Sequence, residues 1–231
     1  MKEFVIIVAG GSGSRMKSEI PKQFISVNGL PILMHTLMAF RNYADDIQIV
    51  LVLPGHQISI WDELCLKYGF EIKHQIVEGG ETRFHSVRNG LLAILDEEAL
   101  ISVHDGVRPV ITNEMISEGF KTAARYGTAI TSVPVKDSVR SIDKHTGSNK
   151  ALDRSSLRLI QTPQTFRSDW MRSAFSQTYS SQFTDCASVL ESAGYTIELI
   201  EGAYENIKIT TPEDLHWAAM YLPDETQKIS G

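Results

Sequence analysis

The chain has 231 residues, 42% of them hydrophobic and 22% charged, and its 22 basic and 28 acidic side chains give a formal net charge of -6. These fractions are ordinary for a globular protein, and the length is enough to bury a sizeable core. Such an acidic chain lacks the basic surface that general binding to nucleic acid or to an anionic membrane needs, so we expect neither partner. A small anion can still bind where a few cations converge.

Cysteine usage and hydropathy exclude further classes of protein. Cys65 and Cys186 are the only cysteines and form no CxxC pair, so neither a disulfide scaffold nor a zinc ribbon is expected. The apolar run at 4–9 is too short for a signal sequence, and no later run approaches the roughly 20 residues of a membrane helix. We therefore expect a cytoplasmic protein with reduced thiols.

Short apolar runs alternate with amphipathic segments along the chain. Runs rich in Val and Ile predict strands of a mainly parallel sheet that is covered on both faces, at 4–9, 47–53, 72–77, 100–103, 128–133 and 196–200. Amphipathic spacing and caps predict helices at 58–68, 83–95, 112–126 and from Thr211 onward. The repeated strand–helix order predicts one α/β domain over residues 1–231, with three layers and a Rossmann-like, mostly parallel sheet.

Residues 136–158 interrupt this alternation. They are polar, with apolar side chains at Val139, Ile142 and Leu152 and a turn sequence between them, which predicts a two-stranded arm protruding from the sheet. An isolated two-stranded ribbon is marginally stable in water, so a second subunit would give it a surface to pack on. A surface hairpin without a partner fits the pattern equally well.

The sequence AGGSGSRM at 9–16 directly follows the first predicted strand. Its glycines allow backbone N–H groups to approach phosphate oxygens, but neither the GxGxxG pattern nor the Walker A pattern is complete. Arg15 lies inside this loop, and Lys22 follows after a turn at Pro21. Both cations come just after the carboxyl end of the first strand, where open α/β sheets bind ligands, so the segment predicts an anion site.

Further motifs follow in order along the chain. They are PKQF at 21–24, EGGETR at 78–83, HDGVRP at 104–109, LDR at 152–154, QTPQ at 161–164, TDCAS at 184–188 and NIKIT at 206–210. With the loop at 9–16, they make the chain resemble the 2-C-methyl-D-erythritol 4-phosphate cytidylyltransferase family of the nucleotidyltransferase superfamily, over about residues 3–222. The chain departs from the family pattern in small ways, with Gly10 where alanine is usual, Glu81 for aspartate and Ser138 for threonine.

The resemblance implies a nucleotide-diphospho-sugar transferase fold and a specific reaction. CTP and 2-C-methyl-D-erythritol 4-phosphate would give 4-diphosphocytidyl-2-C-methyl-D-erythritol and pyrophosphate, a step of non-mevalonate isoprenoid biosynthesis. The nucleophile is an ionised phosphate, so positioning and electrostatic stabilisation would provide the catalysis. The resemblance also implies Mg²⁺ as a cofactor, held mostly by phosphate and water, and a homodimer formed through the arm.

The same resemblance assigns roles to individual residues. The residues that stabilise the transition state would be Arg15 and Lys22. The nucleotide would bind at Ala9, Gly10, Gly11, Gly13, Gly80, Glu81, Ser86, Asp105 and Gly106, with Asp105 also near the metal. The acceptor would bind at Ser138, Arg154, Thr162, Thr184, Asp185 and Lys208, with Arg154 able to reach the site of a second subunit.

Other interpretations of these residues and of the function stay open at this level. Thr184 could cap a helix, with Asp185 favouring its dipole, and Arg108 could form a structural ion pair; for His104 a structural role is favoured. A ribitol-5-phosphate cytidylyltransferase would share the loop and the chemistry. Two alternatives belong to other classes of protein. One is a dinucleotide-dependent oxidoreductase, which the missing third glycine of the GxGxxG pattern makes less favoured, and the other is a nucleotide-binding regulator without catalysis.

Overall fold

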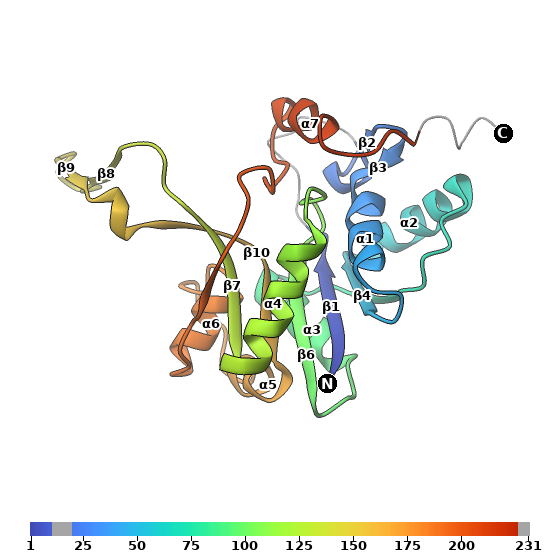
Figure 1. The fold of residues 1–231 in the computed structure, drawn as a ribbon, viewed down its shortest axis with the longest axis horizontal. Helices are drawn as coiled ribbons and strands as arrows, with labels where there is room; N and C mark the ends of the chain where they lie inside the picture. Colours follow the sequence, from blue (N-terminus) through green and yellow to red (C-terminus); the bar gives the residue numbers. More distant parts are fainter. Residues whose placement is uncertain (11–19, 226–231) are drawn as a thin grey trace.

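A seven-stranded sheet forms the centre of the computed structural model, which describes residues 1–10 and 20–225 (Figure 1). Its strands are β1 (Lys2–Val8), β4 (Gln48–Leu53), β5 (Gln75–Glu78), β6 (Ala99–Asp105), β7 (Thr128–Pro134), β10 (Arg158–Arg167) and β11 (Leu199–Glu201). Their order in the sheet is β11-β7-β10-β6-β1-β4-β5, and only β10 runs antiparallel to its neighbours β6 and β7. The predicted, mostly parallel sheet is confirmed.

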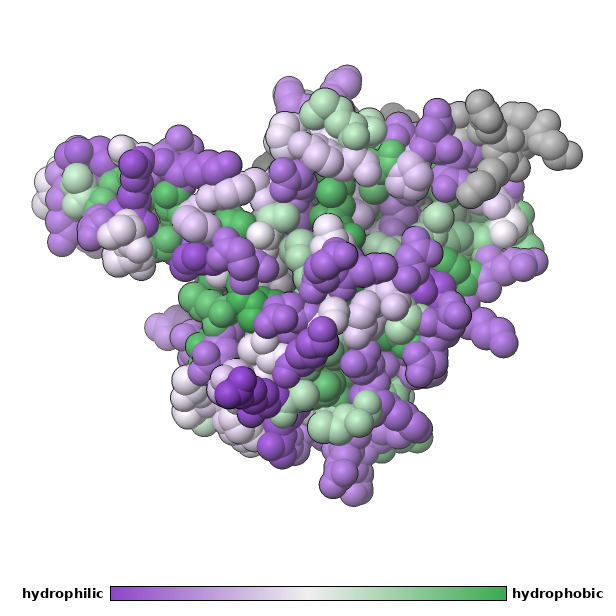
Figure 2. Space-filling view, in the orientation of Figure 1, coloured by the Kyte–Doolittle hydropathy of each residue, from purple (hydrophilic) through white to green (hydrophobic). Residues whose placement is uncertain are grey.

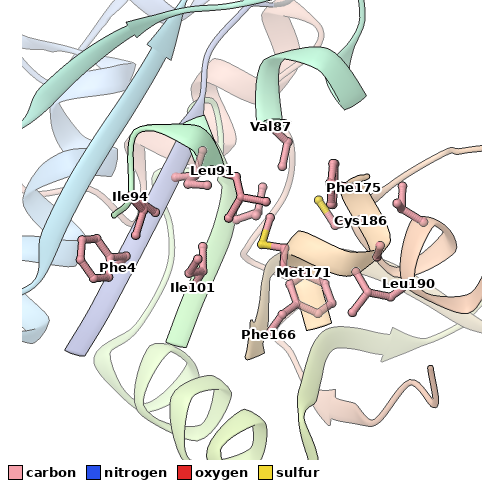
Figure 3. Packing of buried hydrophobic residues seen from close by; sticks show 14 of the residues in the cluster. Phe4, Val87, Leu91, Ile94, Ile101, Phe166, Met171, Phe175, Cys186 and Leu190 are labelled. Atoms are coloured by element: carbon pink, nitrogen blue, oxygen red, sulfur yellow. The ribbon is translucent and has the colours of Figure 1, made fainter. Parts of the chain in front are cut away.

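Helices cover both faces of this sheet. One face carries α1 (Ile32–Tyr43), α2 (Gly55–Tyr68) and α4 (Asn113–Tyr126), and the other carries α3 (Arg83–Leu92), α5 (Ser168–Phe175) and α6 (Cys186–Ser192). Alternation along β1 explains the two layers, because Phe4 and Ile6 join the core with α3, α5 and α6 whereas Val5 and Ile7 join the other core. Figure 3 shows the first of these clusters. The fold is the predicted three-layer α/β arrangement.

Each predicted strand overlaps an observed one, but β10 was not predicted. Its buried half consists largely of polar side chains, among them Gln161, Thr162, Gln164 and Thr165. These side chains hydrogen-bond to distant parts of the chain; Thr165 Oγ1, for example, donates to Ser102 Oγ at 3.3 Å. Hydrophobic periodicity cannot detect a strand whose buried face is polar and paired elsewhere.

The predicted helices are present, and their caps match the sequence. Thr112 caps α4 by accepting from the N–H of Met115, and Thr211 forms a capping box with Asp214 at the start of α7 (Pro212–Ala219). Helices α1 and α5 were not predicted, and α6 was only left open as a helix that starts near Thr184 and Asp185. In α1 every residue from Ile32 to Leu37 is buried, so the first turns show little contrast between a buried and an exposed face.

Small elements bring the N- and C-terminal parts of the chain together. The short 3₁₀ helix η2 (Lys22–Phe24) precedes a hairpin of two strands, β2 (Ser26–Val27) and β3 (Leu30–Pro31). At the turn of this hairpin, the Asn28 side chain donates to the carbonyl groups of Ala219 and Leu222 at 2.9 Å each. A small apolar cluster around Ile209 packs α7 against this hairpin and the loop after β6. Lys22 is thereby brought to the end of the central strands.

The predicted arm consists of β8 (Val139–Ile142) and β9 (Asn149–Leu152), paired in antiparallel fashion. Figure 1 shows it projecting from the ends of β7 and β10 away from the body of the molecule, and Figure 2 shows it as a mixed purple and green extension. Ile142 on the arm is 66% exposed. The assignment of residues 1–231 to one domain stays a prediction. No helix in the described ranges is long and apolar enough to cross a membrane.

Candidate active site

Asp105, the last residue of β6, is surrounded by three cationic side chains. Its Oδ1 atom lies 3.4 Å from Nη2 of Arg83, and its Oδ2 atom lies 3.0 Å from Nζ of Lys208 and 3.4 Å from Nε of Arg108. Arg83 begins α3, Arg108 follows β6, and Lys208 lies between β11 and α7. Three positive charges thus face one negative charge, which leaves a local excess of positive charge in a chain that is acidic overall.

These cations also determine the protonation state of Asp105. Its side chain is only 10% exposed, and burial by itself raises the pKa of a carboxyl group. Arg83, Lys208 and Arg108 overcome this effect and hold the pKa of Asp105 well below its ordinary value of 3.8. Asp105 is therefore an anion at neutral pH, suited to orienting cations and accepting hydrogen bonds rather than donating a proton.

A chain of hydrogen bonds fixes the backbone around Asp105. The N–H of Asp105 donates to Thr162 Oγ1 at 3.1 Å, and this hydroxyl lies 3.1 Å from Nδ1 of His104. Nε2 of His104 lies 2.9 Å from the carbonyl oxygen of Arg108, which can only accept, so Nε2 carries the proton and Nδ1 accepts from Thr162. Burial lowers the pKa of His104 to about 4, which keeps the ring neutral, as a structural residue here requires.

Thr162 has a structural role in this network. Its side chain is 4% exposed, and its hydroxyl already accepts from Asp105 and donates to His104. Thr162 therefore holds the end of β6 in place, and its contact with the acceptor stays a prediction.

Lys22 reaches the same end of the sheet from η2. Its side chain is 8% exposed, and Nζ donates to the carbonyl oxygen of Ile209 at 3.3 Å. Ile209 follows Lys208 directly, and its N–H donates to the carbonyl oxygen of Val107 at 2.9 Å. A buried ammonium group at this place adds to the positive charge at the carboxyl ends of β1 and β6, where open α/β sheets bind their ligands.

The turn after β5 is closed by a side chain of α3. Ser86 Oγ accepts from the N–H of Gly80 at 3.1 Å and lies 3.4 Å from its carbonyl oxygen. A Cβ atom on Gly80 would lie 2.5 Å from Cβ of His85, so the turn requires glycine there. Ser86 therefore shapes the turn, and the exposed Glu81 follows it.

The end of β1 meets the loop after β6 at very close range. A Cβ atom on Gly106 would lie 2.8 Å from Cβ of Ala9, so glycine allows the two segments to touch. The carbonyl of Ala9 accepts from Nε2 of Gln23 at 2.8 Å. At Gly10 an added Cβ would meet only Pro54 at 3.7 Å, so the alanine usual in the family would fit as well. Arg15, Gly11 and Gly13 lie outside the described residues, and their roles stay predictions.

Thr184 and Asp185 precede α6 and form its start. Asp185, and not Thr184, is the cap: its Oδ1 accepts from the N–H of Ser188 and its Oδ2 from Nε2 of Gln164, at 2.8 Å each. Thr184 is exposed, and its backbone N–H donates to Ser188 Oγ at 3.0 Å. A carboxylate offers about four lone-pair positions, so Asp185 keeps some capacity to accept from a ligand.

Two residues assigned to the acceptor are not brought to this cluster within one chain. Nη1 of Arg154 donates to the carbonyl oxygen of Lys136 at 2.6 Å at the base of the arm, and Ser138 is exposed nearby. Within residues 20–225, neither residue hydrogen-bonds or forms an ion pair with Asp105 or Lys208. Whether Arg154 serves a second subunit stays a prediction.

The residues at this site do not fit direct ligation of a magnesium ion. Both carboxylate oxygens of Asp105 face cations, and a bound dication would be repelled by Arg83, Lys208 and Arg108. In the described ranges, no group of three or more His, Cys, Asp or Glu side chains is arranged to hold a metal ion. Asp105 as a metal ligand is therefore not supported.

Comparison with known proteins places this chain in a family. The family model described as 2-C-methyl-D-erythritol 4-phosphate cytidylyltransferase matches residues 4–224. The chain belongs to the 2-C-methyl-D-erythritol 4-phosphate cytidylyltransferase family. It is therefore a nucleotidyltransferase, and this family is favoured over the ribitol-phosphate relatives and over a dinucleotide-dependent oxidoreductase.

Relatives of that name cover nearly the whole chain. The enzyme of Bacteroides thetaiotaomicron is 46% identical over 93% of this chain and 97% of its own length, and that of Porphyromonas gingivalis is 48% identical over 96% and 98%. Among solved structures, the 2-C-methyl-D-erythritol 4-phosphate cytidylyltransferase from Francisella tularensis is 31% identical, with a TM-score of 0.80 over 96% of this chain and all of that chain. The 4-diphosphocytidyl-2C-methyl-D-erythritol synthase from Anaerococcus prevotii is 28% identical, with a TM-score of 0.79 over 95% and 98%.

The sequence-based assignment missed two cations of the cluster. Arg83 was only part of the EGGETR motif, and Arg108 was left between a site residue and a structural ion pair. Arg108 connects the end of β6 with the segment between β11 and α7, because its Nη1 atom also donates to the carbonyl oxygen of Asn206 at 2.7 Å. Their sequence positions could have identified them, because each is an arginine just after a strand end at the carboxyl edge of the sheet, where ligands bind.

Proposed function

We propose that this chain transfers the cytidylyl group of CTP to 2-C-methyl-D-erythritol 4-phosphate, forming 4-diphosphocytidyl-2-C-methyl-D-erythritol and pyrophosphate. The observation that carries the proposal is the convergence of Arg83, Arg108 and Lys208 around the carboxylate of Asp105 at the carboxyl end of β6. The buried ammonium group of Lys22 donates to the carbonyl oxygen of Ile209, the residue after Lys208. Two polyanions must meet in this reaction, and an excess of fixed positive charge reduces their repulsion. The family named above has members described by this activity.

The chemistry forms one bond and breaks one. An oxygen of the acceptor phosphate attacks the α-phosphorus of CTP, the bond to the β-phosphate oxygen breaks, and pyrophosphate leaves with the electron pair. No proton needs to be removed from the nucleophile, so we assign no general base. Lys22, together with Arg15, would stabilise the negative charge that gathers on the α-phosphate.

Neighbouring residues supply binding and orientation. Asp105 is a fixed anion 10% exposed at the end of β6, and it can accept hydrogen bonds from ribose hydroxyl groups. Lys208 is 41% exposed beside it, which leaves its ammonium group accessible to the acceptor phosphate. The turn at 78–80, which Ser86 closes, and the end of β1 would bind the cytosine ring through backbone groups.

We also propose Mg²⁺ as a cofactor and a homodimer as the working form. Magnesium prefers phosphate oxygens and water to an all-protein cage, so it needs no carboxylate of this chain when it neutralises the triphosphate. Exposed apolar side chains on and near the arm, such as Ile142 and Leu159, support burial against a second subunit. Cys65 and Cys186 are free thiols, which suits a cytoplasmic location.

The substrate assignment is tested by measuring pyrophosphate release with CTP and Mg²⁺ in the presence of 2-C-methyl-D-erythritol 4-phosphate or ribitol 5-phosphate. The proposal expects kcat/KM to be higher with the methylerythritol phosphate and expects UTP to replace CTP poorly. Faster turnover of ribitol 5-phosphate would overturn the proposed acceptor, and binding of CTP without turnover of either compound would overturn the proposed catalysis.

A further inference from the structure

Arg83 lies where the Asp105 cluster meets the start of α6. Its Nη2 atom is 3.4 Å from Oδ1 of Asp105, and its Nη1 atom is 3.3 Å from Sγ of Cys186. Cys186 is fully buried in the apolar cluster of Figure 3, where it lies beside Phe175. A carboxylate on one strand and a thiol on one helix therefore hold two corners of the guanidinium group.

The rest of the guanidinium group has donors to spare. Arginine carries five N–H donors, and in the described part of the chain the Arg83 guanidinium group donates hydrogen bonds to Asp105 and Cys186. The side chain is 28% exposed. A cavity of about 10 Å³, too small for a polyol, is lined by Arg83, Thr184 and Asp185 together with the apolar side chains of Phe84, Phe175, Phe183 and Val189. Arg83 therefore lies beside the segment assigned to the acceptor.

A polyol needs both hydrogen-bond donors and acceptors from its site. The carboxylate of Asp185 supplies acceptors only, so the oxygen of a bound hydroxyl group requires a donor from another residue. Thr162, one donor expected from the sequence, is already engaged with Asp105 and His104. Arg83 is a neighbouring side chain with donors left, in an orientation fixed at two points.

We propose that Arg83 donates hydrogen bonds to a hydroxyl oxygen of the acceptor polyol and so contributes to the choice of acceptor. This inference rests on the proposed function. Asp105 and Cys186 hold the planar guanidinium group so that its free edge faces the polyol. A lysine at this position could pair with Asp105 but could not also reach Cys186 and the polyol in fixed geometry.

Steady-state kinetics of Arg83→Gln and Arg83→Lys test the proposal. Loss of a charge-assisted hydrogen bond should raise the KM for the acceptor about 10- to 100-fold in Arg83→Gln, and Arg83→Lys should recover only part of this loss. The KM for CTP should rise much less than the KM for the acceptor, since Arg108 and Lys208 still hold Asp105. Arg88→Gln is the matched control, because Arg88 lies on the same helix over the ring of Phe84 and should change neither constant.

A second measurement separates contact with the polyol from a merely structural role. Acceptor analogues that each lack one hydroxyl group should include one that the wild-type enzyme uses poorly and that Arg83→Gln no longer distinguishes from the full acceptor. The proposal is overturned if Arg83→Gln keeps the acceptor KM, if both KM values rise together with a fall in Tm, or if the penalty for every analogue is the same in both proteins. Turnover by the wild type in the same assay tests the proposed function separately. A wild-type enzyme without activity would overturn both the proposed function and the proposed role of Arg83.

Discussion

Lys208 and Asp105 face each other at the end of β6, with 3.0 Å between Nζ and Oδ2, although they come from distant parts of the chain. Arg108 shares the same carboxylate oxygen, and Arg83 takes the other. The carboxylate thus serves as the fixed point around which cations from three segments are arranged. Its removal should affect both stability and nucleotide binding.

The variant Asp105→Asn should unfold more easily than the wild type at neutral pH, by about 2 kcal/mol, because three cations lose their counter-charge. The pKa of Asp105 is depressed in the folded state, so its contribution to stability is fully present above the ordinary value of 3.8 and is lost as the pH falls below it. Urea unfolding at a series of pH values measures the difference in free energy of unfolding between the wild type and Asp105→Asn. This difference should be constant above pH 3.8 and should decrease below it. Asp137→Asn, at an exposed aspartate, is the control. A difference between the wild type and Asp105→Asn that does not decrease in acid would contradict the pairing of Asp105 with its three cations.

His104 should make folding sensitive to mild acid. Burial lowers its pKa from 6.5 to about 4, so the unfolded chain binds a proton in this window that the folded chain does not. Between these values, falling pH should cost the wild type up to about 3 kcal/mol more of its free energy of unfolding than it costs His104→Asn. Other histidines are present in both proteins and cancel in the difference.

The exposed His145 provides the control for this experiment. His145→Asn should keep the wild-type dependence of stability on pH. If the free energy of unfolding changed equally with pH for the wild type and His104→Asn between these pH values, His104 would not be held neutral in the folded protein.

The structure explains which features the sequence could predict. Parallel strands were predicted because their apolar runs are continuous, and the capped helices because residues such as Thr112 mark their starts. Strand β10 was missed because its buried half is polar, and helix α1 because every residue from Ile32 to Leu37 is buried, His35 and Thr36 included. Neither element shows a continuous run of apolar residues or a clear separation of apolar and polar positions, the two signals on which the prediction relied.

Within the site, the sequence predicted residue types better than contacts. Lys22, Asp105 and Lys208 were assigned to the site, and the fold brings them together. The partners of Arg83 could not be predicted, because its contacts with Asp105 and Cys186 depend on how α3 and α6 pack against the sheet. Pattern and propensity carry no information about such long-range packing.

Mixing two inactive variants tests whether Arg154 acts across a dimer. If Arg154 completes the site of the partner, dimers that contain one Arg154→Ala chain and one Lys22→Met chain have one intact site. Random reassociation of equal amounts should then recover about a quarter of wild-type activity. Recovery should require exchange of subunits, so each variant alone, incubated identically, is the control. No recovery in a mixture shown to contain heterodimers would place Arg154 in its own chain's site or outside the site.

The most direct test of the electrostatic account is the rate of cytidylyl transfer by Lys22→Met with saturating CTP, Mg²⁺ and acceptor. A buried ammonium group that stabilises charge on the α-phosphate should be worth about 10²–10³ in kcat, because removal of one such donor costs that much elsewhere. Lys67→Met on the exposed face of α2 should keep the wild-type rate, and circular dichroism should show that both variants are folded. A folded Lys22→Met enzyme that forms the cytidine diphosphate product at the wild-type rate would contradict the account.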